Sequence, residues 1–182
     1  RFAAADLSAE VSFLYDPLDA ALAAALRADD AAMEAFGAEH ARRVGTLERV
    51  ALLEEERGAW RAAIRAWSEA LGLPEEERLY VLLGLAQVWR SAGDGRTAAI
   101  FAAEAMDLAE GLEGFDGRSY AHAALLRAGA HLSLGRPAEG LSHLFILMAQ
   151  GLDVTASRWP DLAPEIEDLV AGFDAEAARR GD

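Results

Sequence analysis

Residues 58–71 read GAWRAAIRAWSEAL, and their order of small and large apolar residues returns twice along the chain. Residues 93–106 read GDGRTAAIFAAEAM and residues 135–148 read GRPAEGLSHLFILM, so that each copy opens on a glycine. Within each copy the apolar residues recur at the three- and four-residue spacing of one helix face. Another small residue stands seven residues before each glycine: Ala51, Ala86 and Ala128. The repeat predicts three helical hairpins that each turn at a glycine and approach closely through their small residues.

These residues resemble the tetratricopeptide repeat, in which a small residue in helix A, a turn glycine, and small and aromatic positions in helix B follow one another. The resemblance covers about residues 44–151 and implies an all-α fold, a tetratricopeptide-like α-solenoid. Its three hairpins are expected at about residues 44–77, 79–110 and 121–151. Pro74 stands near the family's closing proline. An unrelated helical bundle is the alternative fold.

The chain departs from the family pattern in two places. The usual tyrosine of helix A is replaced in every copy, by Glu54, Trp89 and His131. The second junction contains about seven extra residues, 111–117, so the hairpins need not stack with uniform curvature.

The segment before the repeats, residues 1–43, is predicted to be helical. Leu7–Tyr15 and Pro17–Ala28 are expected to form a degenerate hairpin, which is a candidate fourth repeat without a turn glycine. Ala31–Arg43 is alanine-rich and weakly amphipathic, and we expect it to connect this hairpin to the first clear copy.

The segment after the repeats, residues 152–182, is predicted to contain a capping helix and a tail. Residues 157–161 read SRWPD and interrupt the helical pattern, after which apolar residues recur at helical spacing: Leu162, Ile166, Leu169, Val170 and Phe173. A solenoid end exposes an apolar face that must be covered. We therefore expect Trp159 and Phe173 to pack on the last hairpin.

Composition limits the classes to which the protein can belong. The 182 residues are 53% hydrophobic, and 42 of them are alanine, which favours one helical globular domain. Seventeen basic residues, all arginine, face thirty-one acidic ones, and the net charge of −14 argues against a nucleic-acid partner. The apolar runs are far shorter than the roughly 18 residues of a membrane span. We expect a cytoplasmic location, and because the sequence starts at Arg1 rather than Met, a removed leader or anchor is left open.

The residue pattern predicts no catalytic residue, no metal site and no cofactor. The chain has no cysteine, its four histidines are never four residues apart, and no nucleotide-binding or hydrolase motif occurs. Glu75–Glu77 follow Pro74 and are interpreted as the start of a helix, where negative charge complements the helix dipole. Glu54–Glu56 instead precede Gly58, at the unfavourable end of a helix, and we expect a solvated surface there, offset by Arg57, Arg61 or Arg65.

The resemblance implies a non-catalytic interaction module or scaffold that binds a peptide or helix of a partner in a concave groove. In this family helix A lines the groove, and its contact positions carry over to twelve residues: Glu48, Leu52, Glu55, Glu56, Tyr80, Leu83, Gln87, Arg90, His122, Leu125, Gly129 and Leu132. Such a groove is acidic at its N-terminal end and apolar towards the third copy, which suits a partner with basic and apolar ends. Tyr80, Leu83 and Leu125 are alternatively core residues between hairpins.

Two other classes of function are left open by the sequence. A structural protein would self-associate through its apolar groove or its C-terminal helix. A small-ligand sensor would use polar groups inside the superhelix, for which His122, His131 and Arg90 are the candidates.

Overall fold

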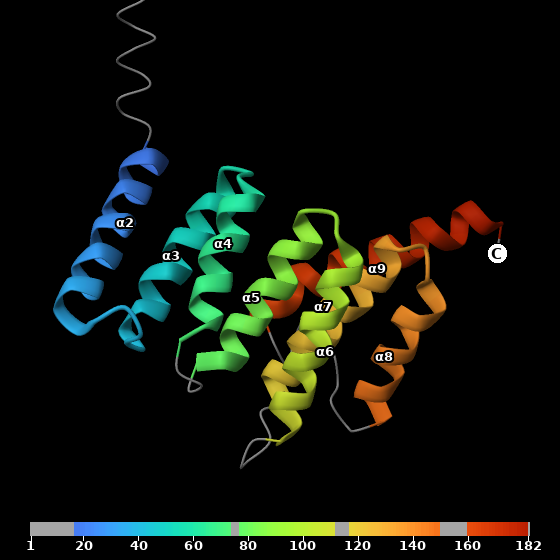
Figure 1. The fold of residues 1–182 in the computed structure, drawn as a ribbon. Helices are drawn as coiled ribbons and strands as arrows, with labels where there is room; N and C mark the ends of the chain where they lie inside the picture. The colour runs from blue at the N-terminus through green and yellow to red at the C-terminus, as the bar shows by residue number, and fades with distance from the viewer. Residues whose placement is uncertain (1–16, 74–76, 112–116, 150–159, 182) are drawn as a thin grey trace, which may run out of the picture. The chain divides into compact units, whose positions relative to one another are not determined.

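A computed structural model of the chain describes residues 17–73, 77–111, 117–149 and 160–181. In these ranges the protein is all-α and contains no strand, as the composition predicts (Figure 1). None of the described helices combines the length and the apolar composition needed to cross a membrane. Several predictions lie outside the described residues, namely those for Leu7–Tyr15, Pro74, the first two residues of Glu75–Glu77, residues 112–116 and Trp159.

Contacts divide the chain into two compact units, Arg1–Glu75 and Glu76–Asp182. The boundary between the units falls after the first of the three expected hairpins. In the first unit α2 packs on the first hairpin, and in the second unit the other two hairpins pack on each other and α9 packs on α7.

In the first unit, the described helices are α2 (Pro17–Phe36), α3 (Arg42–Glu56) and α4 (Trp60–Leu71). Helix α3 packs on both of its neighbours. Its buried apolar residues recur at helical spacing: Val44, Leu47, Val50 and Ala51. They share the core with Leu22 and Ala25 of α2 and with Ala63 and Trp67 of α4.

A buried arginine joins the three helices of the first unit. Arg43, at the start of α3, donates hydrogen bonds from Nε and Nη2 to the two carboxylate oxygens of Asp29 in α2, at 3.1 and 2.8 Å. Its guanidinium also donates to Glu69 in α4 and to the carbonyl of Ala38. Burial alone would raise the pKa of Asp29, but the hydrogen bonds from Arg43 and Thr46 outweigh it and lower that pKa. A charge as buried as Arg43 is stable only because all these acceptors surround it.

In the second unit, the described helices are α5 (Arg78–Ser91), α6 (Gly95–Gly111), α7 (Gly117–Ser133), α8 (Pro137–Ala149) and α9 (Ala163–Arg180). A short 3₁₀ turn, Pro160–Leu162, precedes α9. Each helix from α5 to α8 packs on the next, and α5 also packs on α7.

Small residues bring α6 close to its neighbours. Ala98, Ala102, Ala105 and Ala109 are completely buried. A Cβ atom at Gly95 would lie 2.8 Å from the carbonyl oxygen of Ala130 in α7, so no larger residue fits there without a shift of one helix. The small positions of the repeat are therefore the contact surfaces between helices.

The three turn glycines of the repeat adopt the same local structure. Gly58, Gly93 and Gly135 have φ angles of +69°, +84° and +70°, a conformation that favours glycine. In each turn the residue after the glycine donates its backbone N–H to a carbonyl five residues earlier: Ala59 to Glu54, Asp94 to Trp89, and Arg136 to His131. This is the Schellman arrangement, which satisfies carbonyls at the end of a helix.

Candidate functional site

The most distinctive surface of the second unit is the face of α7 on which α9 lies (Figure 1). Pairs of residues follow one another in the same direction along α7 and along the segment formed by the 3₁₀ turn and α9. Near the start of α7, Arg118 forms an ion pair with Asp161, and His122 lies 3.0 Å from Glu165. Further along, Gly129 faces Leu169, and Leu132 faces Gly172. Helix α9 therefore runs in the same direction as α7.

At the polar end of this contact, one carboxylate receives groups from two helices. His122 Nε2 of α7 lies 3.0 Å from Glu165 Oε2, and Arg90 Nη2 of α5 lies 3.5 Å from Glu165 Oε1. Arg90 Nη2 also donates a hydrogen bond to Gln87 Oε1 at 3.1 Å, which holds the guanidinium on this side of α5. Glu165 therefore accepts a hydrogen bond from the Arg90 guanidinium, while its other oxygen lies beside the His122 ring.

The remaining length of the contact depends on glycines. A Cβ atom at Gly172 of α9 would lie 2.5 Å from Leu132 Cδ2. A Cβ atom at Gly140 of α8 would lie 2.9 Å from the carbonyl oxygen of Ala128 and 3.1 Å from Phe173 Cζ of α9. A larger residue at Gly140 would meet the backbone of α7, and one at Gly172 would displace the Leu132 side chain. We call the surface formed by Arg90, His122, Gly129, Leu132 and Gly140 the helix seat.

The twelve residues predicted to line a groove occupy three different environments. Four of them lie at the helix seat or touch it: Arg90, His122, Gly129 and Leu132. Gln87 adjoins this group through its hydrogen bond with Arg90. Leu83 and Leu125 are 6% and 3% exposed and belong to the core, which was the alternative interpretation for them, whereas Tyr80 is 42% exposed.

The four predicted residues of α3 lie in the first unit. Leu52 is 49% exposed, and Glu56 is exposed as well. Glu48 is partly exposed. Glu55 accepts a hydrogen bond from Trp67 Nε1 at 3.1 Å, and burial raises the pKa of its carboxyl although this hydrogen bond acts in the opposite direction.

The acidic run at the end of α3 is partly offset by a neighbouring arginine. Arg57 Nη1 lies 3.3 Å from Glu54 Oε2, and its Nη2 lies 3.1 Å from Asp19 Oδ1 in α2. Of the three arginines named for this role, Arg57 is the one with an ion pair to the run. The unfavourable interaction with the helix dipole is thereby reduced.

The histidines named for a ligand sensor fall into two separate groups. His122 faces Glu165, whereas His131 stacks on His143 with ring centroids 5.3 Å apart and lies 3.4 Å from Glu139. Burial, together with the positive charge of Arg127, lowers the pKa of His143 to about 4. Among the described residues no group of three or more acidic or histidine side chains is arranged to hold a metal ion.

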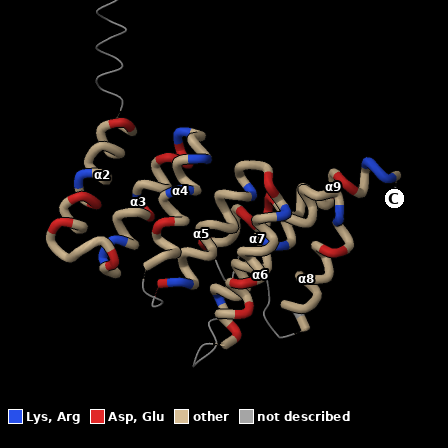
Figure 2. The backbone as a smooth tube through the Cα atoms, in the orientation of Figure 1, with Lys and Arg blue, Asp and Glu red and all other residues tan. Residues whose placement is uncertain are grey.

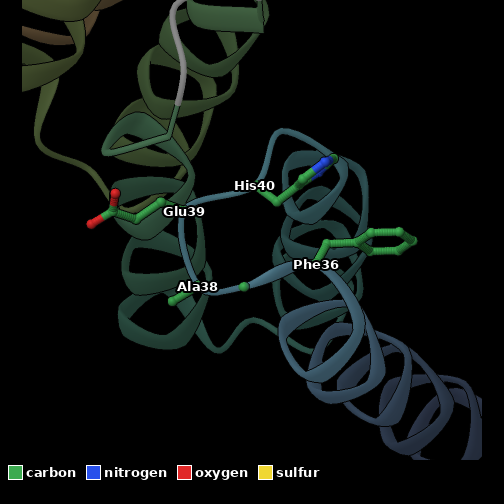
Figure 3. A pocket seen from close by; sticks show the side chains of 5 residues that line it. Phe36, Ala38, Glu39 and His40 are labelled. Atoms are coloured by element: carbon green, nitrogen blue, oxygen red, sulfur yellow. The ribbon is translucent and has the colours of Figure 1, made fainter.

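A hollow lies at the turn between α2 and α3, in the first unit. It is lined by Phe36, Gly37, Ala38, Glu39 and His40, and Figure 3 shows the Glu39 carboxylate pointing away from the two rings. The rings of Phe36 and His40 are 5.0 Å apart, and the Arg42 guanidinium lies 4.6 Å from the centre of the Phe36 ring. Every residue lining the hollow is exposed, so these contacts order the turn and do not enclose a ligand.

Sequence reasoning did not identify the residues of α9 that complete the site: Glu165, Leu169 and Gly172. Phe173 was expected to pack on the last hairpin, and its ring does lie against Gly140 of α8, whereas Leu169 was predicted only as part of the apolar stripe of this helix. One sequence signal for the site is Gly172, because a glycine inside an amphipathic helix often marks a close approach between helices.

Comparison of the chain with protein-family models, with curated proteins and with solved structures finds no match. The function is therefore argued from the site itself.

Proposed function

We propose that this chain is a non-catalytic interaction module built of tetratricopeptide-like hairpins, and that it binds a helical segment of a partner protein. The repeated Schellman turns at Gly58, Gly93 and Gly135 support the relationship between the hairpins. The buried small residues of α6 support their stacking.

One observation carries the binding role, namely that α9 lies lengthwise on the helix seat. An apolar groove that accepts the face of an amphipathic helix is a recurring mode of recognition between proteins. Here the seat already contains such a helix, so its shape and charge are known to accommodate one. In this proposal α9 is a resident occupant with which a partner helix competes.

The low burial of α9 suggests that a partner helix can replace it on the helix seat. Of its eighteen residues only Leu169 and Glu176 are buried, and Val170 is 55% exposed. By contrast, nine residues of α7 are buried. A helix with so little buried apolar surface gains little free energy from burial, and belonging to the same chain as its seat raises its local concentration there.

The test uses the full chain with Gly172→Leu, which removes the fit of α9 to Leu132 and leaves α5 and α7 unaltered. A fluorescent peptide with residues 160–182 is titrated against this variant and against the unaltered chain. We expect saturable binding that is at least about tenfold tighter for Gly172→Leu, because its own α9 competes less. Leu169→Asp should act in the same direction.

Ala171→Leu is the matched control, because Ala171 is the exposed neighbour of Gly172. Circular dichroism should show that all variants keep their helices. If the peptide binds none of the chains, including both variants of α9, the helix seat is not a binding surface and the proposal is wrong.

A second candidate function, self-association, is supported by the outer face of α8. Leu141, Phe145 and Ile146 are 39%, 63% and 44% exposed. Most of α8 carries no charge, as the tan tube in Figure 2 shows. An exposed apolar group of this kind is typical of interaction surfaces. If it joins two copies, light scattering will show a mass above that of one chain, and Phe145→Asp will restore the single-chain mass whereas Ala138→Asp will not.

A further inference from the structure

We infer that the helix seat selects acidic helices, in which a carboxylate is followed by leucine four residues later, glycine seven residues later and an aromatic residue eight residues later. This inference rests on the proposed function and names the class of partner. The pattern is the one that α9 presents through Glu165, Leu169, Gly172 and Phe173. Each position of the pattern has a counterpart on α5, α7 or α8.

The positions at which a partner helix needs carboxylates follow from the arginine and histidine side chains that face Asp161 and Glu165. Arg118 forms an ion pair with Asp161, and its hydrogen bond lowers the pKa of that carboxyl. One turn further along, Arg90 and His122 face Glu165. The chain as a whole has a net charge of −14, so the two arginines of this row, Arg118 and Arg90, are a local exception on an acidic protein.

The sequence predicts a partner with a basic end, whereas the helix seat requires a partner that carries carboxylates. The expectation of a basic partner depended on the carboxylates of α3, which lie in the first unit. The helix seat of the second unit is formed by other side chains, and arginine and histidine require acceptors from the helix that they bind.

The direction of the partner helix follows from the same contacts. Asp161, in the turn before α9, and Glu165, in the first turn of α9, both meet the first half of α7. A partner with the same pattern therefore binds parallel to α7. Its acidic first turn also suits the positive end of its own helix dipole.

The glycine and aromatic positions of the partner helix follow from the close approach of α9 to α7 and α8. At position 172 a Cβ atom would lie 2.5 Å from Leu132 Cδ2, so glycine fits opposite Leu132 without displacing that side chain, whereas any larger residue must move it. Gly140 leaves the space that the Phe173 ring occupies, because a Cβ there would lie 3.1 Å from Cζ of that ring. Leucine at position 169 meets the bare backbone of Gly129.

The experiment uses the full chain carrying Leu169→Asp as the receptor, and labelled peptides with residues 160–182 as probes. Relative to the parent peptide, we expect Glu165→Gln to weaken binding about fivefold and Gly172→Val more than about tenfold. Val170→Ser is the matched control and should bind like the parent peptide, because Val170 is exposed on α9.

A second receptor, with both Leu169→Asp and Arg90→Ala, tests the carboxylate contact itself. With this receptor the difference between the parent peptide and the Glu165→Gln peptide should shrink to less than about twofold. High salt should shrink it in the original receptor as well, because partly exposed ion pairs are screened.

The outcomes separate this inference from the proposed function. If the parent peptide binds but Glu165→Gln and Gly172→Val bind equally well, the seat accepts helices without this selectivity and the inference is overturned, while the interaction module stands. If no peptide binds either receptor, both are overturned. Light scattering of the unaltered chain gives one more outcome. If it shows a dimer, two copies exchange their α9 helices, and the partner helix of this pattern is α9 of a second copy.

Discussion

Helices α3 and α7 occupy the same place in their hairpins, yet their faces differ in what they accept. Six residues before the turn glycine, α3 has Leu52 and α7 has Gly129, and three residues before it they have Glu55 and Leu132. The glycine and leucine of α7 receive α9, whereas Leu52 is half exposed and Glu55 accepts a hydrogen bond from Trp67. Individual residues on the first helix of a hairpin, rather than the hairpin as such, therefore determine whether another helix packs there.

The two units also differ in how their helices are joined. Arg43 connects three helices of the first unit by charged hydrogen bonds. In the second unit, close contacts at Gly95, Gly140 and Gly172 bring helices together. Substitutions at these places should therefore have different effects in the two units.

The largest effect is expected from Arg43→Met. It leaves Asp29 in a partly buried place without its guanidinium, and removing one member of a buried ion pair costs about 3 kcal/mol. Chemical denaturation should show this loss, and Arg57→Met, at an exposed pair, should cost less than about 1 kcal/mol. Equal losses for the two variants would show that Arg43 does not join the helices in the way described.

A somewhat smaller loss is expected from Gly140→Val in the second unit. Its Cβ would meet the backbone carbonyl of Ala128, which cannot move like a side chain, and overpacking of this kind costs about 2 kcal/mol. Gly45→Val is the control in α3, because nothing lies within 4 Å of a Cβ at Gly45. Amide hydrogen exchange should show faster exchange in α8 and α9 for the first variant and no change there for the control.

Alanine substitutions of helical glycines should distinguish α3 from α7 by about 1 kcal/mol. Gly45→Ala is expected to stabilise the chain by about 0.5–1 kcal/mol, since alanine favours the helix and fits into open space. Gly129→Ala should gain nothing, because its Cβ would lie 3.2 Å from Arg90 Nη1 and push the guanidinium away from Glu165. A thermal melt of both variants measures the difference, and a gain at Gly129 equal to that at Gly45 would contradict the close fit.

Acid should destabilise the second unit through His143. The folded pKa of about 4 lies below the value of 6.5 for the free ring, so between these values the unfolded chain binds a proton that the folded chain does not. Stability is therefore lost as the pH falls from about 6.5 to about 4. The loss should be about 1 kcal/mol, because solvent screens the partly exposed ring.

The variant that checks this effect is His143→Gln, which removes the titrating ring. Hydrogen exchange in α7 and α8 is compared at pH 7 and pH 5 for both chains, after correction for the intrinsic effect of pH on exchange. A loss of stability that persists in the variant would assign the effect to another group.

The smallest effect, of the opposite sign, is expected in the first unit from Glu55. Burial raises the folded pKa of Glu55 above 4.5, so the folded state binds more protons there and stability falls as the pH rises through this window. Glu55→Gln keeps an acceptor for Trp67 and should stabilise the chain at pH 7 by about 0.5 kcal/mol, given the partial exposure of the group. Denaturation near pH 4 should show little difference between the two chains, and a gain at pH 4 as large as at pH 7 would contradict this explanation.

Much of the secondary structure could be predicted because its causes are local. The turn at Gly93 needs a residue that tolerates positive φ, and the small residues of α6 recur at helical spacing. The buried positions of helix A were harder to predict. Leu83 and Leu125 carry the same side chain as Leu52, but only packing with neighbouring helices determines which of them is exposed.

The candidate site could be predicted only in part. The resemblance to a known repeat selected Arg90, His122, Gly129 and Leu132 from α5 and α7, and these do form one surface. It did not indicate that Glu165 would lie between Arg90 and His122, because nothing local to residue 165 specifies partners more than forty residues away.

The order of helices, the glycine turns and the apolar stripe of α9 follow from the sequence itself, since each depends on residues within a few positions of one another. Where α9 packs was decided by the tertiary structure alone. An apolar stripe specifies that a helix must be covered but not by which surface, and the choice of α7 came from matching a glycine to a leucine and a carboxylate to two donors across the fold.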